Sequence, residues 1–422
     1  MRKIISISLS PNTEKDDVFL AMRLIFQPWK WKQGPITEIL EKIFQEKMGL
    51  GQCFSFNSGR SCLLAAFSAM GIGEGDEIIA QSFTCNAVIN PILKFKAKPV
   101  YVDIGPNLNM DLNKIEEKIT PKTKAIIAQH TFGWPAEIEE IKKICEKHKL
   151  ILIEDCAHAL GAKRNGKFCG SFGDISFFSF GRDKIISSVY GGMLCANNKE
   201  LASKVSDFYH QINYPKNSWI IQQILHPILT NLLILPFYGI IIGKIFMAFF
   251  VNLNILSKSV TKNENQGILP EYFPYRLPNA LASMALNQFE KLDKFNTHRR
   301  KIAMFYNKEL EAEPDYKIVF SNLENNDYPI YLKYPLLTKN SKNIMEKMKK
   351  NNIYLNDGWR DSAIMPPMTN LEKMIYLAGS CSLSESIVKE IIYLPTHINI
   401  SLAQAKKIVD LLKTENIVKI KE

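Results

Sequence analysis

Residues 177–188 read FFSFGRDKIISS, which is the most informative pattern in this chain of 422 residues. An apolar strand is expected over 175–178, and polar residues follow it directly. Lys184 comes within a turn of the strand end, ahead of the pair Gly191-Gly192. A lysine held there by a rigid strand can form a Schiff base with an aldehyde cofactor. A solvated loop charge is the more common role of such a lysine, so the pattern needs a partner elsewhere in the chain.

An acidic pair ends another predicted strand, about thirty residues upstream of the lysine. Residues 150–153 are apolar and lead into Glu154 and Asp155, which small apolar residues follow. A carboxylate in such surroundings is costly unless a cation pairs with it. A protonated pyridine nitrogen is such a cation, and an aspartate that keeps it protonated makes the ring an electron sink. The alternative is that Asp155 only caps the next helix.

A third element is the turn Asn57-Ser58-Gly59-Arg60-Ser61, ahead of an apolar helix predicted over 62–70. Small and hydroxylated residues at a loop-to-helix junction suit an anion, because free backbone N–H groups and the helix dipole converge there. An ordinary serine N-cap is the alternative. Taken in order, the turn, Asp155 and Lys184 correspond to the phosphate site, pyridine partner and Schiff-base lysine of a pyridoxal-phosphate site.

Short apolar runs separated by helical segments predict an α/β fold with a mainly parallel sheet flanked by helices. Polar residues gather at the carboxyl ends of these runs, where open α/β sheets bind their ligands. The predicted strands before the acidic pair are 77–80, 99–102, 125–129 and 150–153.

The composition is that of a globular protein, with 46% hydrophobic and 23% charged residues. A chain of this length is expected to form two domains. The net charge of +11 comes mostly from lysines scattered over predicted helix surfaces, so no nucleic-acid partner is expected. The apolar run after Arg2 and Lys3 is too short for a secretory signal.

Eight cysteines occur without a CxxC pair, mostly inside apolar runs. This usage predicts reduced, buried thiols in a cytosolic protein, and it argues against a disulfide framework or a metal site. The cysteines are residues 53, 62, 85, 145, 156, 169, 195 and 381.

These segments together resemble the DegT/DnrJ/EryC1/StrS family of sugar aminotransferases. The resemblance implies the fold type I architecture of pyridoxal-phosphate enzymes. It implies a large cofactor-binding domain over 1–290 and a smaller C-terminal α/β domain over 291–422, with an insertion at about 216–265 that the resemblance does not cover. The similar segments are 57–61, 71–77, 97–103, 130–133, 154–159, 177–192, 275–277, 288–292 and 394–397.

The resemblance implies a role for each residue of the predicted site. Lys184 is the catalytic residue and forms the Schiff base with pyridoxal phosphate, while Asp155 pairs with the pyridine nitrogen. His158 stands where the family usually has glutamine beside the ring hydroxyl, and histidine can still hydrogen-bond there. The residues implied to contact the phosphate are Arg60, Ser61 and Ser179.

Three positions depart from the family pattern. Arg60 replaces a threonine, which adds a charged phosphate contact but needs more room. Cys85 stands where an aromatic residue normally stacks on the cofactor ring, and Phe83 is an alternative stacking partner. Pro274 replaces an asparagine that in the family reaches the phosphate of the neighbouring subunit.

The implied activity is ping-pong transamination, in which glutamate or glutamine donates the amine to a nucleotide-linked keto-sugar. The product is expected to enter cell-surface polysaccharide or lipopolysaccharide, and the enzyme is expected to be a homodimer. One alternative is a pyridoxal-phosphate keto-sugar dehydratase, although that branch generally replaces the lysine at position 184 with histidine. Another is a catalytically silent, membrane-attached scaffold, which the changes at Cys85 and Pro274 suggest.

The insertion is strongly apolar: residues 219–243 contain no formally charged side chain apart from a protonated His226. A single membrane crossing would put the two halves of the enzyme on opposite sides, and Pro227, Pro236 and Gly239 are expected to interrupt the run. Two interpretations stay open. A broken helical hairpin over 219–256 lies on the cytoplasmic face of the membrane, or the insertion is buried on the protein or in a dimer interface.

Overall fold

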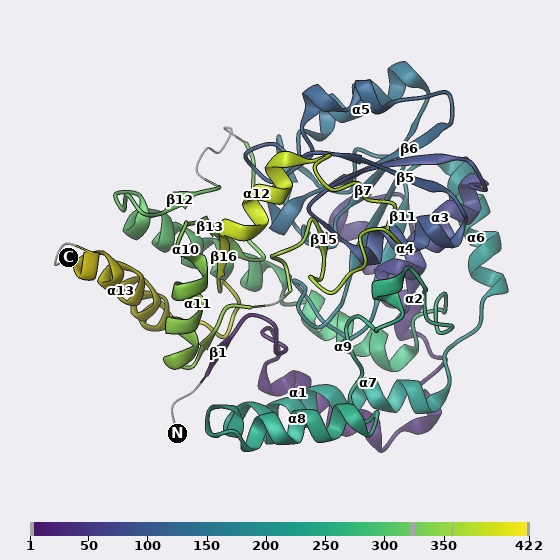
Figure 1. Cartoon of the computed structure of the whole chain (residues 1–422). Helices are drawn as coiled ribbons and strands as arrows, with labels where there is room; N and C mark the ends of the chain where they lie inside the picture. The colour runs from purple at the N-terminus through teal and green to yellow at the C-terminus, as the bar shows by residue number, and fades with distance from the viewer. Residues whose placement is uncertain (1–3, 321–325, 357, 420–422) are drawn as a thin grey trace.

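The computed structural model describes residues 4–320, 326–356 and 358–419 of the chain. At its centre is a seven-stranded sheet in the order β2-β11-β10-β7-β6-β3-β5 (Figure 1). Only β11 runs antiparallel to its two neighbours, so the prediction of a mainly parallel sheet is confirmed. In chain order the strands are β2 (Gln52–Phe56), β3 (Glu77–Gln81), β5 (Lys98–Val102), β6 (Thr123–Gln129), β7 (Ile151–Asp155), β10 (Ile175–Ser179) and β11 (Gly192–Ala196).

Helices cover both faces of this sheet, because the strands are apolar on both sides. Ile78 packs into a core cluster that includes residues of α3 (Gly59–Met70), α4 (Asn86–Lys94) and α6 (Lys199–Gln211). The adjacent Ile79 points to the opposite face and packs into a cluster with α5 (Ile138–His148). Alternate side chains of one strand therefore enter two different cores, as expected for a buried parallel sheet.

One predicted helix differs from the structure at its start. Helix α3 begins at Gly59, three residues before the predicted start, and Ser58 caps it by accepting a hydrogen bond from the Ser61 N–H. After the insertion the chain forms two helices, α9 (Asn279–Phe289) and α10 (Leu292–Leu310). The predicted domain boundary at 290/291 falls in the short break between them.

The C-terminal part contains a three-stranded antiparallel sheet in the order β12-β13-β16. The N-terminal strand β1 (Ile5–Ser6) pairs in parallel with β14 (Ile353–Tyr354), so the first described residues lie with the C-terminal part. The other elements here are β12 (Lys317–Ile318), β13 (Tyr334–Leu337), α11 (Ser341–Lys350), β15 (Ile364–Met365), α12 (Ser382–Glu390), β16 (Ile391–Leu394) and α13 (Leu402–Lys419).

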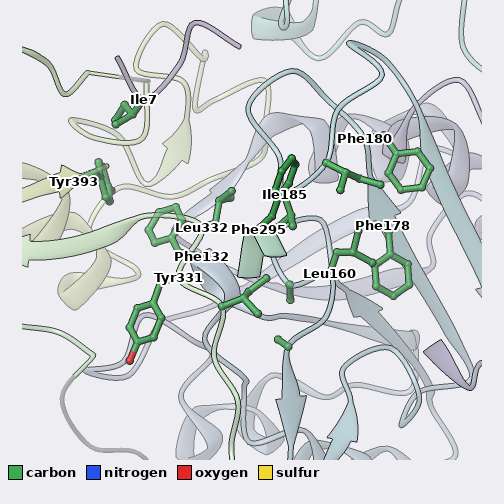
Figure 2. Close-up of a cluster of buried hydrophobic side chains, with 14 of the residues drawn as sticks. Ile7, Phe132, Leu160, Phe178, Phe180, Ile185, Phe295, Tyr331, Leu332 and Tyr393 are labelled. Atoms are coloured by element: carbon green, nitrogen blue, oxygen red, sulfur yellow. The ribbon is translucent and has the colours of Figure 1, made fainter. Parts of the chain in front are cut away.

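One hydrophobic core joins the loop after β10 to the C-terminal part. Figure 2 shows Phe180 and Ile185 of that loop in the same cluster as Phe295 of α10 and as Leu332 and Tyr393. All five side chains are buried. The backbone on both sides of Lys184 is therefore fixed by packing, which restricts where the lysine side chain can reach.

The insertion forms a helical hairpin. Its first arm runs without a break through α7 (Asn217–Leu229), the π-helical η5 (Thr230–Ile234) and the 3₁₀-helical η6 (Leu235–Ile240). The expectation that Pro227, Pro236 and Gly239 interrupt this run is wrong, because the helical path continues past Pro227 through the wider π-helical turn. The chain reverses at Ile241, and α8 (Ile242–Asn252) returns along η5 and η6.

The first arm of the hairpin packs on the protein body rather than standing free. Helix α7 contacts α1 (Lys15–Ile25) and α9, and Ile220, Ile224 and His226 of α7 are buried. Figure 1 shows α1, α7 and α8 together along one edge of the molecule. By length and composition Asn217–Ile240 is the one helix of the described residues that could span a membrane, and 39% of its most apolar window is buried.

Two of the cysteines are paired, contrary to the prediction of reduced thiols. Cys53 of β2 and Cys195 of β11 form a disulfide. They face each other in the antiparallel register of these strands, with their Cα atoms 4.2 Å apart, and sequence spacing gives no sign of that register. The other six cysteines are free, and all but the half-buried Cys85 are buried.

Candidate functional site

A cavity of about 1050 Å³ opens at the carboxyl ends of β6, β7 and β10 and at the N-terminus of α3. Gln129, Asp155 and Ser179 reach it from the last positions of these three strands. Five of the six predicted site residues line it together: Arg60, Asp155, His158, Ser179 and Lys184. This is the edge of the sheet where polar residues were predicted to meet.

Lys184 lies in the loop between β10 and β11, and its side chain is 15% exposed. Its Nζ is 3.0 Å from His158 Nε2 and 4.0 Å from Asp183 Oδ2. The Asn12 side chain donates to the carbonyl oxygens of Lys184 and Ile185. Buried Arg299 in turn donates to Asn12 Oδ1 at 2.6 Å, so a side-chain network as well as the core holds the lysine loop in place.

Asp155 ends β7 and is 4% exposed. Its Oδ1 accepts a hydrogen bond from the Ala157 N–H at 2.9 Å. Burial raises the pKa of Asp155 to about 6, although the Ala157 N–H, Lys184 and His130 oppose the rise. The ionised carboxylate is therefore unfavourable by itself, and a cationic ring nitrogen in the cavity would stabilise it.

His158 lies between Lys184 and an aromatic wall formed by Phe132 and Trp359. Its Nδ1 accepts from the Phe132 N–H at 3.4 Å, and its ring stacks on Phe132 with centroids 5.4 Å apart. Trp359 meets the imidazole edge to face, with the ring centroids 4.8 Å apart. Burial, with smaller effects of Lys184 and Lys333, holds the pKa of His158 well below its usual range, so the ring is neutral at working pH.

The N-terminus of α3 presents hydrogen-bond donors to the cavity. Ser58 and Gly59 line the cavity there, and within the described chain the N–H groups of Gly59 and Arg60 donate no backbone hydrogen bond. Gly192 permits this arrangement, because a Cβ at that position would lie 2.7 Å from the Ser58 backbone. Ser179 lines the cavity nearby. An anion is favoured at such a helix start.

Ser61 is placed differently from the prediction. Its buried side chain does not line the cavity, and its Oγ donates to Asn57 Oδ1 at 2.6 Å. Ser58, one turn earlier, lines the cavity instead. A helix start at Gly59 explains the difference, and the N-cap preference of serine is the sequence signal that points to Ser58.

Arg60 lines the cavity, but a carboxylate neutralises its charge. Arg60 Nε lies 2.7 Å from Oε1 of the buried Glu264, and the guanidinium also donates to the Ser259 carbonyl. Burial by itself lowers the pKa of Arg60, but Glu264 together with Tyr190, Cys85 and Tyr272 outweighs burial, so the pKa lies above its usual value. The guanidinium stacks on Phe273 as well. Sequence reasoning had no means of finding Glu264, which is more than 200 residues away.

Arg182 is a cavity residue to which the sequence assigned no role. It donates to the carbonyl and hydroxyl oxygens of Ser257, and it lies over the ring of Tyr190. Its buried Nε has no hydrogen-bond partner in the described part of the chain. The sequence signal that could have identified Arg182 as a site residue is its position two residues before Lys184.

The aromatic wall differs from the alternative suggested by the sequence. Cys85 lines the cavity, and burial raises the pKa of its thiol. Phe83 does not line the cavity, because its buried ring packs against Phe132 and Trp359. Trp359, from the C-terminal part, lines the cavity and was not singled out from the sequence.

The residues of this cavity fit pyridoxal phosphate. An amine, a buried carboxylate with one protein donor, and the free N–H groups of a helix start all face one space. Lys184, Asp155 and the α3 N-terminus could therefore hold the aldehyde carbon, the ring nitrogen and the phosphate, respectively.

A second cluster, His130, Glu154 and Cys156, has ligand atoms close enough to hold a metal ion. However, other protein groups already bind the ligand atoms of His130 and Glu154. Glu154 accepts from the N–H groups of Gly170, Phe172 and Gly173, and His130 Nε2 lies 3.0 Å from its carboxylate. The cluster therefore anchors the loop after β9 (Lys167–Phe168) to β7.

A model of the DegT/DnrJ/EryC1/StrS aminotransferase family matches residues 12–218 and 255–413. GDP-perosamine synthase of Vibrio cholerae is 32% identical over 287 residues, which are 68% of this chain and 65% of that protein. The UDP-N-acetyl-3-dehydro-alpha-D-glucosamine 3-aminotransferase of Acidithiobacillus ferrooxidans is 43% identical over 193 residues, 45% of this chain and 52% of that protein. This chain thus matches about two thirds or less of the length of these relatives.

Among solved structures, Helicobacter pylori PseC, an aminotransferase involved in the biosynthesis of pseudoaminic acid, superposes with a TM-score of 0.75 at 22% identity. The superposition covers 98% of this chain and 99% of that one. At this identity the similarity shows the fold, which is the predicted fold type I. The family match leaves out residues 219–254, which form most of the helical hairpin.

Proposed function

Because this chain belongs to the DegT/DnrJ/EryC1/StrS aminotransferase family, we propose that it aminates a nucleotide-linked keto-sugar, with glutamate or glutamine as amino donor. Pyridoxal phosphate is the cofactor of this family, which confirms the cofactor predicted from the sequence. Two relatives are named for GDP- and UDP-linked sugars, which supports this substrate class. A relative named as a spore coat polysaccharide biosynthesis protein supports a role in cell-surface polysaccharide or lipopolysaccharide synthesis. The observation that carries the proposal is the convergence of Lys184, Asp155 and the α3 N-terminus on one cavity.

The residues divide the work between proton transfer and binding. Bound pyridoxal phosphate supplies an electron sink for the carbanion formed at the substrate. Lys184 Nζ accepts a proton from the substrate carbon and returns it as general base and acid. The neutral ring of His158, 3.0 Å away, orients that amine. Asp155 keeps a negative charge opposite the ring nitrogen.

The phosphate is assigned to the start of α3. Ser58, Ser179 and the N–H groups of Gly59 and Arg60 are the donors that face this part of the cavity. The guanidinium of Arg60 acts indirectly in this assignment, because Glu264 holds it. Ser61 supports the turn from behind through Asn57.

Purified protein with pyridoxal phosphate provides the test. We expect a visible absorbance band that bleaches on addition of glutamate or glutamine and returns when an accepted nucleotide keto-sugar is added. A panel of GDP-, UDP- and dTDP-linked keto-sugars, with mass spectrometry of the products, identifies the substrate. Loss of water from the sugar without gain of an amine would support the dehydratase alternative. A protein that never forms the band would support the silent scaffold.

The hairpin supports a peripheral membrane contact of a cytoplasmic enzyme through residues 219–256. The outer side of the hairpin is apolar and solvent-exposed, and residues 208–263 contain four lysines and no Asp or Glu. Such a surface suits an anionic bilayer. Helix α7 is packed on α1, which favours a helix lying on the membrane over one crossing it. The exposed residues are Leu232, Ile240, Ile241, Ile242, Ile245, Phe249 and Leu253.

Deletion of residues 219–256 tests this contact by fractionation, and an unchanged distribution between membrane and soluble fractions would remove it. A milder variant replaces Ile241, Ile245 and Phe249 with serine, which leaves the packed face of the hairpin intact. We expect this triple variant to lose co-sedimentation with anionic vesicles. Light scattering on the same proteins tests the proposed homodimer, and a triple variant that becomes monomeric would assign the apolar face to the dimer instead.

A further inference from the structure

The hairpin has a second side, which faces the cavity. Tyr238 of η6 and Lys244 and Met247 of α8 line the same cavity as Lys184 and Asp155. Because helix positions three or four apart share a face, this lining side lies apart from exposed Ile245 and Phe249. The segment outside the family match therefore forms part of the wall of the candidate active site.

Lys244 is held at this wall by two aromatic rings. Its Nζ lies 5.4 Å from the ring centroid of Tyr238 and 5.4 Å from that of Tyr354. The two rings meet edge to face at 5.2 Å, and they link the hairpin to β14 in the C-terminal part. This cation–π arrangement fixes the ammonium group in place without neutralising it.

Lys244 has no carboxylate partner among the ion pairs of the described residues. It is also the only formally charged residue between Lys216 and Lys258. A lone ammonium in an otherwise apolar hairpin, facing a cavity, suits an anionic ligand. Lys349 of α11 lines the same cavity and adds a second positive charge, while Glu346 of the same helix adds one negative charge.

The cavity has room for a ligand beyond the cofactor. Its volume of about 1050 Å³ is at the upper end of pockets that hold a single drug-sized molecule, roughly 300–1,000 Å³. The cofactor donors lie at the strand ends, so a sugar reacting near Lys184 must extend its remaining part away from the sheet. Arg60 does not offer a free charge for that part, because Glu264 neutralises it.

We propose that Lys244, held between Tyr238 and Tyr354, binds the diphosphate of the nucleotide-linked sugar. This inference rests on the proposed function and names the residue that recognises its substrate. The hairpin then acts as a specificity element, which reads the charged part of the substrate while the strand ends perform the chemistry.

The experiment measures the binding of GDP, UDP and dTDP to the holoenzyme by calorimetry. Lys244→Met keeps the length and apolar stem of the side chain, and we expect it to weaken the best of these nucleotides about tenfold. Lys244→Arg should stay within about threefold of wild type, since it keeps the charge. Lys258→Met is the matched control, because this exposed lysine belongs to the same insertion but does not line the cavity.

A readout that does not depend on the nucleotide separates this inference from the proposed function. The rate at which glutamate bleaches the cofactor band should be unchanged in Lys244→Met, and its band should show that the protein is folded. Equal nucleotide affinity in wild type and Lys244→Met would overturn the role of Lys244. Wild-type protein that binds a nucleotide but is never bleached by an amino donor would instead overturn the proposed aminotransferase activity.

Discussion

The strand-end wall and the hairpin wall of the cavity are built in different ways. At the strand ends, Asp155 and Ser179 are fixed by the sheet, and a side-chain network and a hydrophobic core hold Lys184. On the hairpin wall, Tyr238 and Lys244 lie on helices with one apolar side in solvent, outside the family match. Reacting groups need placement within a fraction of an ångström, whereas recognition of a charged, flexible diphosphate does not.

This contrast leads to an expectation about where changes have an effect. Changes at the strand ends should abolish the chemistry with every substrate. Changes on the hairpin should alter which substrate binds and leave the cofactor in place. Surface segments tolerate insertion better than strands do, because water or a local helix can supply hydrogen-bond partners for their backbone groups.

Lys184→Ala should have the largest effect. It removes both the amine that can bond the cofactor aldehyde and the proton carrier, so we expect the rate to fall by roughly three orders of magnitude or more. The visible absorbance band of the protein-bound cofactor should be lost as well. Stopped-flow absorbance with glutamate measures both quantities.

Two control variants test whether the loss of activity is specific to a lysine of the strand-end wall. Lys204→Ala removes an exposed helix lysine far from the cavity lining and should behave as wild type. Lys244→Met should keep the band and the glutamate reaction. Wild-type amination by Lys184→Ala would contradict the assignment of the strand-end wall.

Asp155→Asn should lower the rate by about 10²-fold, because the ring nitrogen would lose the carboxylate that keeps it protonated. Although the same variant lowers the rate, it should increase the stability of the cofactor-free protein. The folded-state pKa of Asp155 is about 6, above its usual 3.8, so folding binds a proton. Ionisation of the buried Asp155 therefore lowers the free energy of unfolding of the wild type. This loss is absent below pH 3.8 and grows as the pH rises to about 6, where it reaches about 3 kcal/mol.

Urea unfolding of cofactor-free protein between pH 4 and 8 measures this cost. The stability of Asp155→Asn relative to wild type should rise between pH 4 and 6 and then level off. Adding pyridoxal phosphate should stabilise wild type more than the variant. A stability difference that does not change with pH would show that Asp155 is not a buried, ionising group of the strand-end wall.

Glu264→Gln tests the contact between Arg60, at the start of α3, and the segment that follows the hairpin. Arg60 is 10% and Glu264 is 1% exposed, so the variant leaves a buried guanidinium without its counter-charge. We expect a loss of about 3 kcal/mol in the free energy of unfolding. The double variant Arg60→Met with Glu264→Gln should recover more than half of it, since no unpaired charge remains. Equal losses in the single and double variants would contradict the ion-pair explanation.

Much of the fold could be predicted because its signals are local. Strand β6 contains the apolar run 125–128 and β10 is mostly apolar, and Asp155 and Lys184 lie close to the strand ends in sequence as well as in space. The predicted strands over 77–80 and 99–102 lie within β3 and β5. The roles of these site residues remain predictions until the variants above are measured.

The features that sequence reasoning missed depend on contacts between distant segments. The Cys53–Cys195 disulfide requires the register of two antiparallel strands, and the pairing of Arg60 requires Glu264 in the segment that follows the hairpin. Pro227 was expected to break its helix, but a π-helical turn follows it and the helical path continues. Tertiary contacts determine these three features, and neither the composition nor the spacing of residues in the sequence reveals such contacts.

His158→Gln should have the smallest effect, and it tests how finely the strand-end wall is tuned. His158 is neutral because burial lowers its pKa well below the usual range, so its contribution is a hydrogen bond to Lys184 rather than a charge. A glutamine amide can make the same kind of bond. We expect the rate to change less than about tenfold and the shape of the pH–rate profile between pH 6 and 8 to be unchanged, whereas His158→Ala should cost more. Disappearance of an acidic limb near pH 6.5 in His158→Gln would instead mean that the imidazole itself gains and loses a proton during the reaction.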